Sequence, residues 1–453
     1  MTKIAEQGEP MKTPVRLTIS PEDSFLPEPV AICADGFEPG RTVTIAARLV
    51  DNAGVSWVSE GRFVADANGQ VDVASAPSES GTYSGIDPMG LLWSLQPESG
   101  VDRSFMIKAT EKAHKLGQPL LDPLKPAKIE FTARSDNKEA SAALSQWRLA
   151  PDIDVVDVRE GRLRGVAFKH RDRGFVRGAI MSLTGSGGGV ELNFAPVLAS
   201  LGYDVLSLAY FAYEDLPPVI SSIPLEYFAE GFEWMRKEFG AKKLAVQGAS
   251  RGGELSLILA AYFPQYVSGA IAIVPMYASS PGWDPAKGVA GPSWTLGGKD
   301  IPYAASAPAP AFEDMQRIAN ENPNGFSYTP WFLETMNAPK ARAEAPIPLE
   351  QAAGPILFIS GEDDQMWPCT WGSNVAVDRL RGKGFKHDFR HLALRETGHL
   401  TPLPNVSTIF CQAIHHTLAD MFLACGGTPQ GSARSSLETW AAMKEHYRNM
   451  FSE

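Results

Sequence analysis

The second half of the chain alternates short apolar runs with stretches that have the spacing of amphipathic helices. The apolar runs lack regular polar alternation, and such runs separated by helices are typical of a parallel sheet covered on both faces. The runs are GAIMSL, DVLSLAY, KLAVQG, GAIAIVP and PILFIS, and between them lie ELNFAPVLASLG, PLEYFAEGFEWMRKEFG and GELSLILAAYF. This region therefore predicts βαβ units, with a ligand site at the carboxyl ends of the strands.

Residues 14–134 have a different pattern, because short alternating segments are separated by turn signals such as FEPGR, DNAG and DANGQ. The segments are VRLTI, VTIAARLV, GRFVAD, QVDVAS, SFMIKAT and KIEFTAR. Regularly spaced strands of this kind predict an antiparallel β-sandwich of the immunoglobulin-like type.

The remaining boundaries follow from changes of composition. Residues 135–150 are polar and rich in small side chains, which predicts a linker to a second domain over residues 151–425. Residues 276–346 interrupt the strand and helix alternation with Pro, Gly, Ala and Trp, so we expect a lid-like insertion. Residues 426–453 are expected to form a C-terminal helix.

Length and composition limit the function. A chain of 453 residues is too long for one ordinary hydrophobic core, which predicts two domains. A protein with two domains is also compatible with a homo-oligomer. The net charge of −11, without a basic stripe, argues against nucleic acid as a partner. No apolar run is long enough to span a membrane, and the first residues lack the apolar core of a secretory signal. The four cysteines lack metal-type spacing, so we expect a cytoplasmic protein without a metal or other cofactor.

One short motif carries chemistry. Gly248-Ala249-Ser250-Arg251-Gly252 fits the G-x-S-x-G pattern, and it lies between a predicted strand and a predicted helix. This context is that of a nucleophile elbow, in which a sharp turn exposes the serine hydroxyl. The alternative is a small residue at a tight turn. We expect Ser250 to be the nucleophile.

A nucleophilic serine needs a base and an orienting acid, which follow it in the order Ser, Asp, His. The run PILFISGEDDQMWP is a predicted strand that ends at two aspartates, and the spacing favours Asp364 over Asp363. The run FRHLALRETGHLTP is a strand followed by Gly398 and His399, which makes His399 the expected base. The other histidines fit less well, because they lie in or before that strand, in an expected helix, or outside this order: His387, His391, His415, His416, His114, His170 and His446.

The oxyanion of the tetrahedral intermediate needs preorganised donors. We expect one from the backbone N–H of Arg251 and a second from Ser186 or Gly187, in the loop LTGSGGGVE. A glycine-rich loop also suggests phosphate binding, but no Gly-Lys-Ser/Thr follows, which argues against a nucleoside triphosphate.

The chain resembles a known family, the acyl-CoA thioesterases and bile acid-CoA:amino acid N-acyltransferases, over residues 15–400. The matching segments are SGTYSGIDPMGLLWSLQP, EGRLRGVAF, GSGGGVELNFAPVLASLGYDVLSLAYFAYEDLP, PLEYFAEGFEWM, GASRGGELSL, GEDDQMW and TGH. The resemblance implies a β-sandwich domain followed by an α/β-hydrolase domain with a mostly parallel sheet flanked by helices. It also implies small-molecule acyl thioester substrates, with coenzyme A as part of the substrate.

The resemblance leaves the reaction branch open. Its N-acyltransferase members use cysteine where this chain has Ser250, and an acyl-serine is less prone to aminolysis than an acyl-cysteine. We therefore expect an acyl-CoA thioester hydrolase. The alternatives are acyl transfer to an amine, hydrolysis of another ester, lactone or amide, or a binding module built on a degenerate hydrolase domain. The segment HLTPLPNVS and residues 276–346 depart from the family pattern, and the basic run DRLRGKGFKH is either a contact for coenzyme A phosphates or a solvated helix end.

Overall fold

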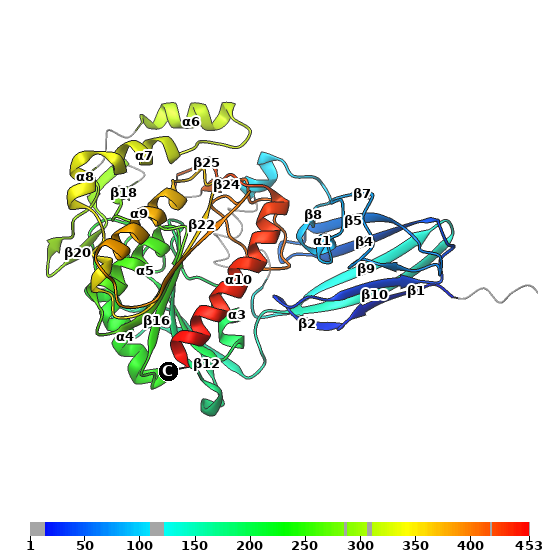
Figure 1. Ribbon diagram of the computed structural model, residues 1–453, viewed down its shortest axis with the longest axis horizontal. Coiled ribbons are helices and arrows are strands. Elements are labelled where there is room, and N and C mark those ends of the chain that lie inside the picture. Colours follow the sequence, from blue (N-terminus) through cyan, green and yellow to red (C-terminus); the bar gives the residue numbers. More distant parts are fainter. Residues whose placement is uncertain (1–13, 109–121, 285–287, 306–309, 417–418, 453) are drawn as a thin grey trace, which may run out of the picture. The chain divides into compact units, whose positions relative to one another are not determined.

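The computed structural model describes residues 14–108, 122–284, 288–305, 310–416 and 419–452 (Figure 1). The chain divides into two compact units. Of these described residues, 14–99 and 127–146 form the first, and 100–108, 122–126 and those from 147 onward form the second. Residues 100–108 and 122–126, which we expect in the sandwich domain from the sequence, thus group with the second unit.

The first unit contains two sheets with antiparallel pairing, which confirms the predicted β-sandwich. Alternate residues of its long strands are buried, as in β4, where Val43, Ile45 and Ala47 point into the core. The smaller sheet has the order β1 (Arg16–Ser20), β3 (Ala31–Asp35) and β6 (Val71–Asp72). The larger has the order β2 (Asp23–Phe25), β10 (Lys138–Trp147), β9 (Ala127–Ser135), β4 (Thr42–Val50), β5 (Ser56–Val64) and β7 (Ser80–Gly81), with β8 (Gln96–Pro97) paired to β5 and α1 (Gly90–Trp93) before it.

The expected linker is wrong, because most of residues 135–150 form strand β10. It pairs with β9 from Lys138 opposite Ser135 to Gln146 opposite Ala127. Its Ala and Ser side chains hid the strand period, and Leu144 is one of its few large buried residues. A segment that looks like a linker by composition therefore completes the sheet.

The segment SFMIKAT was expected to be a strand, but residues 103–108 are helical, and the rest of it lies outside the described residues. Asp102 explains the difference, since its carboxylate accepts the N–H of Phe105 at 2.7 Å and caps the helix. Arg103 then donates to the backbone oxygen of Ala319 at 2.6 Å. Local capping and this contact within the second unit override the strand propensity.

The second unit is built around an eight-stranded sheet, and its helices cover both faces, which confirms the predicted α/β-hydrolase class. Strand pairing is antiparallel between the first three strands of the sheet order and parallel between the others. The order is β11 (Ile153–Val158), β12 (Arg164–His170), β14 (Tyr203–Ala209), β13 (Gly178–Leu183), β16 (Leu244–Ala249), β17 (Val267–Ile273), β22 (Ile356–Gly361) and β23 (Phe389–Leu394).

The central strands are buried along almost their whole length, as expected for a sheet covered on both faces. Figure 1 shows α4 (Glu226–Phe239), α5 (Arg251–Tyr262) and α9 (Cys369–Gly382) on one face, and α3 (Ala195–Ser200) and α10 (Pro429–Phe451) on the other. The expected C-terminal helix is α10, whose Tyr447 hydroxyl donates to Gln247 on β16 at 2.7 Å. Short 3₁₀ turns η1 (Arg173–Phe175) and η2 (Leu349–Gln351) complete these connections.

The region of the expected insertion interrupts the sheet between β17 and β22. It contains β18 (Pro281–Asp284), β19 (Gly288–Pro292), β20 (Trp294–Leu296), β21 (Lys299–Asp300), α6 (Phe312–Glu321), α7 (Thr329–Asn337) and α8 (Pro339–Glu344), and β20 pairs with β15 (Ile223–Pro224). Helix α6 packs through Met315 on a hairpin of β24 (Ala413–His416) and β25 (Met421–Ala424). His415 and His416, expected in a helix, therefore lie in a strand, because β24 pairs in antiparallel register with β25.

Candidate active site

Ser250 lies at a sharp turn between β16 and α5. Its backbone has φ 59° and ψ −122°, a left-handed conformation that is costly for a residue with a side chain. Its N–H donates to the oxygen of Ile273 at the end of β17, at 2.9 Å. A Cβ at Gly248 would come within 2.5 Å of Gly252, and one at Gly252 would collide with the carbonyl oxygen of Thr184. Both glycines of the motif are thus required by close packing, and the turn has the features of a nucleophile elbow.

Asp364 and His399 lie beside each other. Asp364 follows β22 and His399 follows β23, the last two strands in the order of the sheet. His399 Nδ1 is 2.8 Å from Asp364 Oδ2, and both side chains are at least 95% buried. The other carboxylate oxygen of Asp364 accepts the N–H groups of Met366 and Trp367, at 2.8 and 3.2 Å. The carboxylate is therefore held rigidly, with one oxygen available to fix the tautomer of the imidazole.

Trp367 connects this pair to the elbow. Its indole N–H donates to the oxygen of Val274 at 2.9 Å, and its ring packs edge-on against His399 with 5.8 Å between centroids. Val274 follows Ile273, which accepts the N–H of Ser250. The three predicted catalytic residues thus gather around the carboxyl end of β17. Among the described residues, no hydrogen bond joins the Ser250 hydroxyl to His399.

Asp363, the carboxylate that spacing disfavoured, has a different environment. It is exposed, and its Oδ2 accepts the N–H of Gly427 at 2.8 Å. Its neighbour Asp364 is the one that contacts His399. The structure thus places the two adjacent carboxylates in separate hydrogen-bond networks.

The expected oxyanion donors flank Ser250. Arg251 is the first residue of α5, where backbone N–H groups lack intrahelical partners. Ser186 and Gly187 are the central residues of a turn closed by the Gly188 N–H on the Gly185 oxygen at 3.3 Å. A Cβ at Gly185 would lie 3.2 Å from the Ser250 Cβ, so this loop runs directly beside Ser250. Their role as donors remains a prediction.

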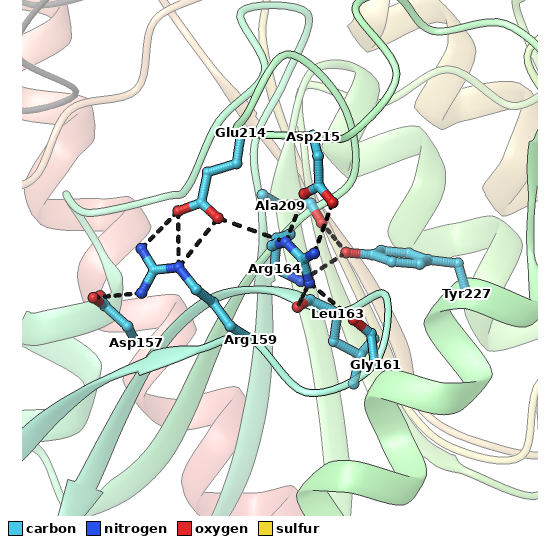
Figure 2. A network of polar contacts seen from close by, with 9 residues as sticks. All are labelled: Asp157, Arg159, Gly161, Leu163, Arg164, Ala209, Glu214, Asp215 and Tyr227. Carbon is cyan, nitrogen blue, oxygen red and sulfur yellow. Dashed lines mark hydrogen bonds and ion pairs between the residues drawn. The ribbon is translucent and has the colours of Figure 1, made fainter.

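A polar network holds the loop that follows β14 (Figure 2). Arg159 pairs with Glu214 at 2.7 Å, and Arg164 pairs with Asp215 at 2.6 Å. In the same loop the oxygen of Phe211 accepts the N–H of Gly189, at 3.1 Å. Sequence reasoning missed this network. It holds the loop after β14, which in turn contacts the glycine loop through the hydrogen bond between Phe211 and Gly189.

A second network that sequence reasoning missed is buried beneath the elbow. The Arg251 guanidinium pairs with Glu254 at 3.2 Å, and Glu254 is fully buried. The Glu254 carboxylate also accepts the N–H of Ser280 at 3.0 Å, and Arg251 donates to the hydroxyl of Ser293. The only sequence signal was a charged pair spaced i, i+3 in an otherwise apolar helix. Because both serines belong to the 276–346 region, this network fixes that region to the elbow.

The nearby cysteines are poor candidates for a nucleophile. Burial raises the pKa of Cys369 and of Cys425 well above the usual value, because the charged thiolate would be desolvated. Cys369 Sγ lies 3.5 Å from the oxygen of Gly361, as a donor to it. Both thiols are structural in character, so neither competes with Ser250 as the expected nucleophile.

The basic run DRLRGKGFKH covers the end of α9 and the residues after it, whereas the start of α9 lies near Asp364. Arg379 pairs with Glu350 at 2.7 Å, and Arg381 pairs with Asp378 at 3.4 Å. The residues after the helix lead into β23, and the backbone oxygen of Asp388 accepts the N–H of Ile356 at the start of β22, at 3.0 Å. The run therefore belongs to the opposite edge of the sheet from Ser250, which favours the solvated helix end.

Across the described ranges, no group of three or more His, Cys, Asp or Glu side chains is arranged to hold a metal ion. In the same ranges, no helix combines the length and the apolar character needed to cross a membrane.

Both halves of the chain match models of one family. Residues 27–160 match the acyl-CoA thioester hydrolase/BAAT N-terminal region, and residues 223–452 match the BAAT/acyl-CoA thioester hydrolase C-terminal region. The chain is similar to acyl-coenzyme A amino acid N-acyltransferase 2 of Rattus norvegicus, with 31% identity over 445 residues that cover 96% of this chain and 97% of that protein. It is similar to acyl-coenzyme A thioesterase 1 of Homo sapiens, with 29% identity over 93% of each chain. It is also 29% identical to the peroxisomal succinyl-coenzyme A thioesterase of Mus musculus, over 91% of each chain.

Proposed function

Because the chain belongs to the acyl-CoA thioester hydrolase/BAAT family, we propose that it hydrolyses acyl-CoA thioesters to a free acid and coenzyme A. The observation that carries this proposal is Ser250, which stands on a strained elbow beside a buried pair of Asp364 and His399. A half-buried hydroxyl with this support is suited to attack on a carbonyl carbon. The acyl group is then carried as an ester of Ser250.

The reaction proceeds in two halves. The Ser250 oxygen bonds to the thioester carbon while His399 takes the hydroxyl proton, and Asp364 stabilises the imidazolium through Nδ1. The C–S bond then breaks, and the coenzyme A thiolate takes the proton back from His399. In the second half His399 removes a proton from water, whose oxygen attacks the acyl carbon. The bond from that carbon to the Ser250 oxygen then breaks, and Ser250 takes the proton back from His399 as the free acid leaves.

The negative charge on the carbonyl oxygen is stabilised in both halves. We assign this role to the backbone N–H of Arg251 and to an N–H of Ser186 or Gly187. Support comes from the position of Arg251 at the start of α5 and from the close approach of Gly185 to Ser250. A thiolate leaving group needs little protonation, so these donors contribute a large part of the rate.

The region from 276 to 346 is proposed to shape the acyl pocket. Its Ser280 and Ser293 contact the Arg251 and Glu254 side chains directly behind the nucleophile. A chain segment fixed at this point is placed to select the length of the acyl group. Its action as a moving lid remains a prediction.

Acyl transfer to an amine is the second candidate, because one similar protein is named an amino acid N-acyltransferase. The serine at position 250 favours water, since a serine ester is less reactive toward amines than a cysteine thioester. The amine dependence of product formation therefore separates the two reactions.

The cytoplasm is the proposed compartment. Support comes from Cys33, Cys369, Cys411 and Cys425, which are free thiols, as in proteins of a reducing compartment. Similar proteins carry mitochondrial and peroxisomal names, so fractionation of the host cell is the check.

The experiment that tests this function measures thiol release from a panel of acyl-CoAs of different chain length, with and without glycine or taurine. Hydrolysis predicts release of coenzyme A that is independent of the amine and that yields the free acid. Formation of an N-acyl amino acid would establish the transferase instead. Turnover of p-nitrophenyl esters without turnover of any acyl-CoA would overturn the substrate class.

A further inference from the structure

A histidine that the proposed mechanism does not use contacts the glycine loop beside Ser250. The His416 Nε2 atom lies 3.1 Å from the hydroxyl oxygen of Ser186, although 230 positions separate the two residues in the chain. His416 is the last residue of β24 and is only 8% exposed. The hairpin of β24 and β25 thus reaches the loop that carries an expected oxyanion donor.

The other ring nitrogen defines the tautomer of His416. The N–H of Ala419 points at His416 Nδ1 over 3.3 Å, and it is shared with the His416 carbonyl oxygen. A nitrogen that faces an N–H donor is the unprotonated one, so the ring hydrogen of a neutral imidazole is on Nε2. Burial, together with the neighbouring His415, lowers the pKa of His416 to about 4, so the ring is neutral near pH 7.

This tautomer determines what the Ser186 hydroxyl does. His416 donates its Nε2 hydrogen to the Ser186 oxygen, which therefore acts as the acceptor in that contact. A hydroxyl has one hydrogen of its own, and this hydrogen is then directed away from His416. Ser186 directly follows Gly185, whose Cβ position would be 3.7 Å from the Ser250 hydroxyl oxygen.

We propose that His416 is a positioning residue that orients the Ser186 hydroxyl to donate a hydrogen bond to the oxyanion formed by attack of Ser250. This inference rests on the proposed reaction through an acyl-Ser250 intermediate. The hydroxyl hydrogen is shared with the oxyanion and is not transferred. The proton of Ser250 still passes to His399, and the electron pair of the carbonyl returns when the C–S bond breaks.

Two substitutions at position 416 test the contact between His416 and Ser186. His416→Gln keeps a side-chain N–H near the Nε2 position, so it retains the donor to Ser186. His416→Asn keeps an acceptor near the Nδ1 position for Ala419 but is too short to reach Ser186. His415→Gln is the matched control, because His415 pairs with Asp420 at 3.3 Å and packs on Phe422 within the same hairpin.

The first measurement is steady-state hydrolysis of an acyl-CoA. Ser186→Ala and His416→Asn are expected to lower kcat about tenfold to a hundredfold with little change in KM, because an oxyanion donor acts in the transition state. His416→Gln and His415→Gln are expected to stay within about threefold of wild type by the same reasoning. The double variant Ser186→Ala with His416→Asn should be no worse than the poorer single variant, because both changes remove the same interaction.

The second measurement is the rate at which a fluorophosphonate probe modifies Ser250. Its phosphoryl oxygen occupies the oxyanion site, so Ser186→Ala and His416→Asn should slow modification while His416→Gln does not. This readout needs no acyl-CoA. If the wild type fails to turn over acyl-CoAs but the order of modification rates holds, the proposed function is lost and the role of His416 stands.

Three results would overturn the inference. Unchanged modification rates and kcat in Ser186→Ala would show that its hydroxyl does not serve the oxyanion. Equal losses in His416→Gln and His416→Asn would remove the donor argument. A loss of kcat in His415→Gln equal to that in the two His416 variants, with a lowered Tm in all three of these histidine variants, would show that the hairpin only stabilises the fold.

Discussion

The charged groups at the two ends of the strands of the eight-stranded sheet differ in their exposure to water. The parallel strands end at the carboxyl edge and begin at the opposite edge. At the edge where the parallel strands end, the side chains of Arg251, Glu254 and Asp364 are almost fully buried. At the opposite edge, Arg379 and Glu350 form a pair whose side chains remain 29% and 26% exposed. The same Arg–Glu chemistry thus occurs in two environments of one sheet.

The difference shows that charged side chains near the candidate site are buried, whereas those at the opposite edge remain in contact with water. Buried charges lose their hydration and are tolerated only with fixed partners, so they hold neighbouring groups in one geometry. Exposed pairs gain little, because water and salt screen them. The carboxyl edge should therefore respond strongly to substitution in both activity and stability, and the opposite edge should respond weakly in both.

The largest effect is expected for Ser250→Ala at the carboxyl edge. The nucleophile is lost while an alanine occupies the same space, so kcat should fall by roughly five to six orders of magnitude. Thiol release and Tm are to be measured together, with Tm unchanged. Activity within tenfold of wild type would remove Ser250 from the mechanism.

The next effect separates two adjacent carboxylates. Asp364→Asn should lower kcat by roughly 10⁴, because the amide favours the wrong imidazole tautomer. Asp363→Asn is the control and should lose less than about tenfold, because its carboxylate contacts the N–H of Gly427. The reverse order in steady-state assays would show that Asp363 is the orienting acid.

The two Arg–Glu pairs give the most direct comparison of stability. Glu254→Ala leaves the Arg251 charge buried without its partner, so the free energy of unfolding should fall by about 3–5 kcal/mol. Glu350→Ala at the opposite edge should cost about 1 kcal/mol or less, because its pair is partly exposed. Urea denaturation measures both. Equal losses would contradict the distinction between the edges.

Acid should affect stability through the carboxyl edge. The pKa of His416 is lowered to about 4 by burial, so between pH 6.5 and 4 the unfolded chain binds a proton that the folded chain does not. This contribution to stability is present above pH 6.5 and is lost as the pH falls toward 4. Tm measured against pH should fall less steeply in His416→Gln than in wild type. Parallel curves would show that His416 does not titrate in this way.

The smallest effect is expected for the basic run at the opposite edge. Replacement of Lys383 and Lys386 by alanine should leave the KM for acyl-CoA within about twofold, because surface charges distant from the site contribute little to ground-state binding. KM is measured at low and high salt. A rise of tenfold or more at low salt would place coenzyme A phosphates on this edge.

The parts of the molecule that follow from local patterns could be predicted from the sequence. Buried strands and the elbow at Ser250 depend on residues within a few positions of each other, and Asp364 and His399 each lie a few residues after a recognisable strand. The strand β10 could not, because its Ala and Ser side chains lack a clear hydrophobic period. The capping of residues 103–108 by Asp102 was also overlooked.

Contacts between distant segments mark the limit of such prediction. The sequence suggests no reason for His416 to meet Ser186, since the hairpin register and the placement of the glycine loop together create that contact. Likewise, Glu254 is recognisable as a charged residue in an apolar helix, but its partner Ser280, and Ser293 that donates to the Ser280 oxygen, emerge only from the packing of the insertion.

The proposed reaction carries the acyl group on Ser250. Rapid mixing of the protein with an acyl-CoA, followed by acid quench and peptide mass spectrometry, detects such an intermediate. We expect an adduct with the mass of the acyl group on the peptide that contains Ser250, and its loss in Ser250→Ala. An adduct on another residue, or full turnover in Ser250→Ala, would rule out Ser250 as the carrier.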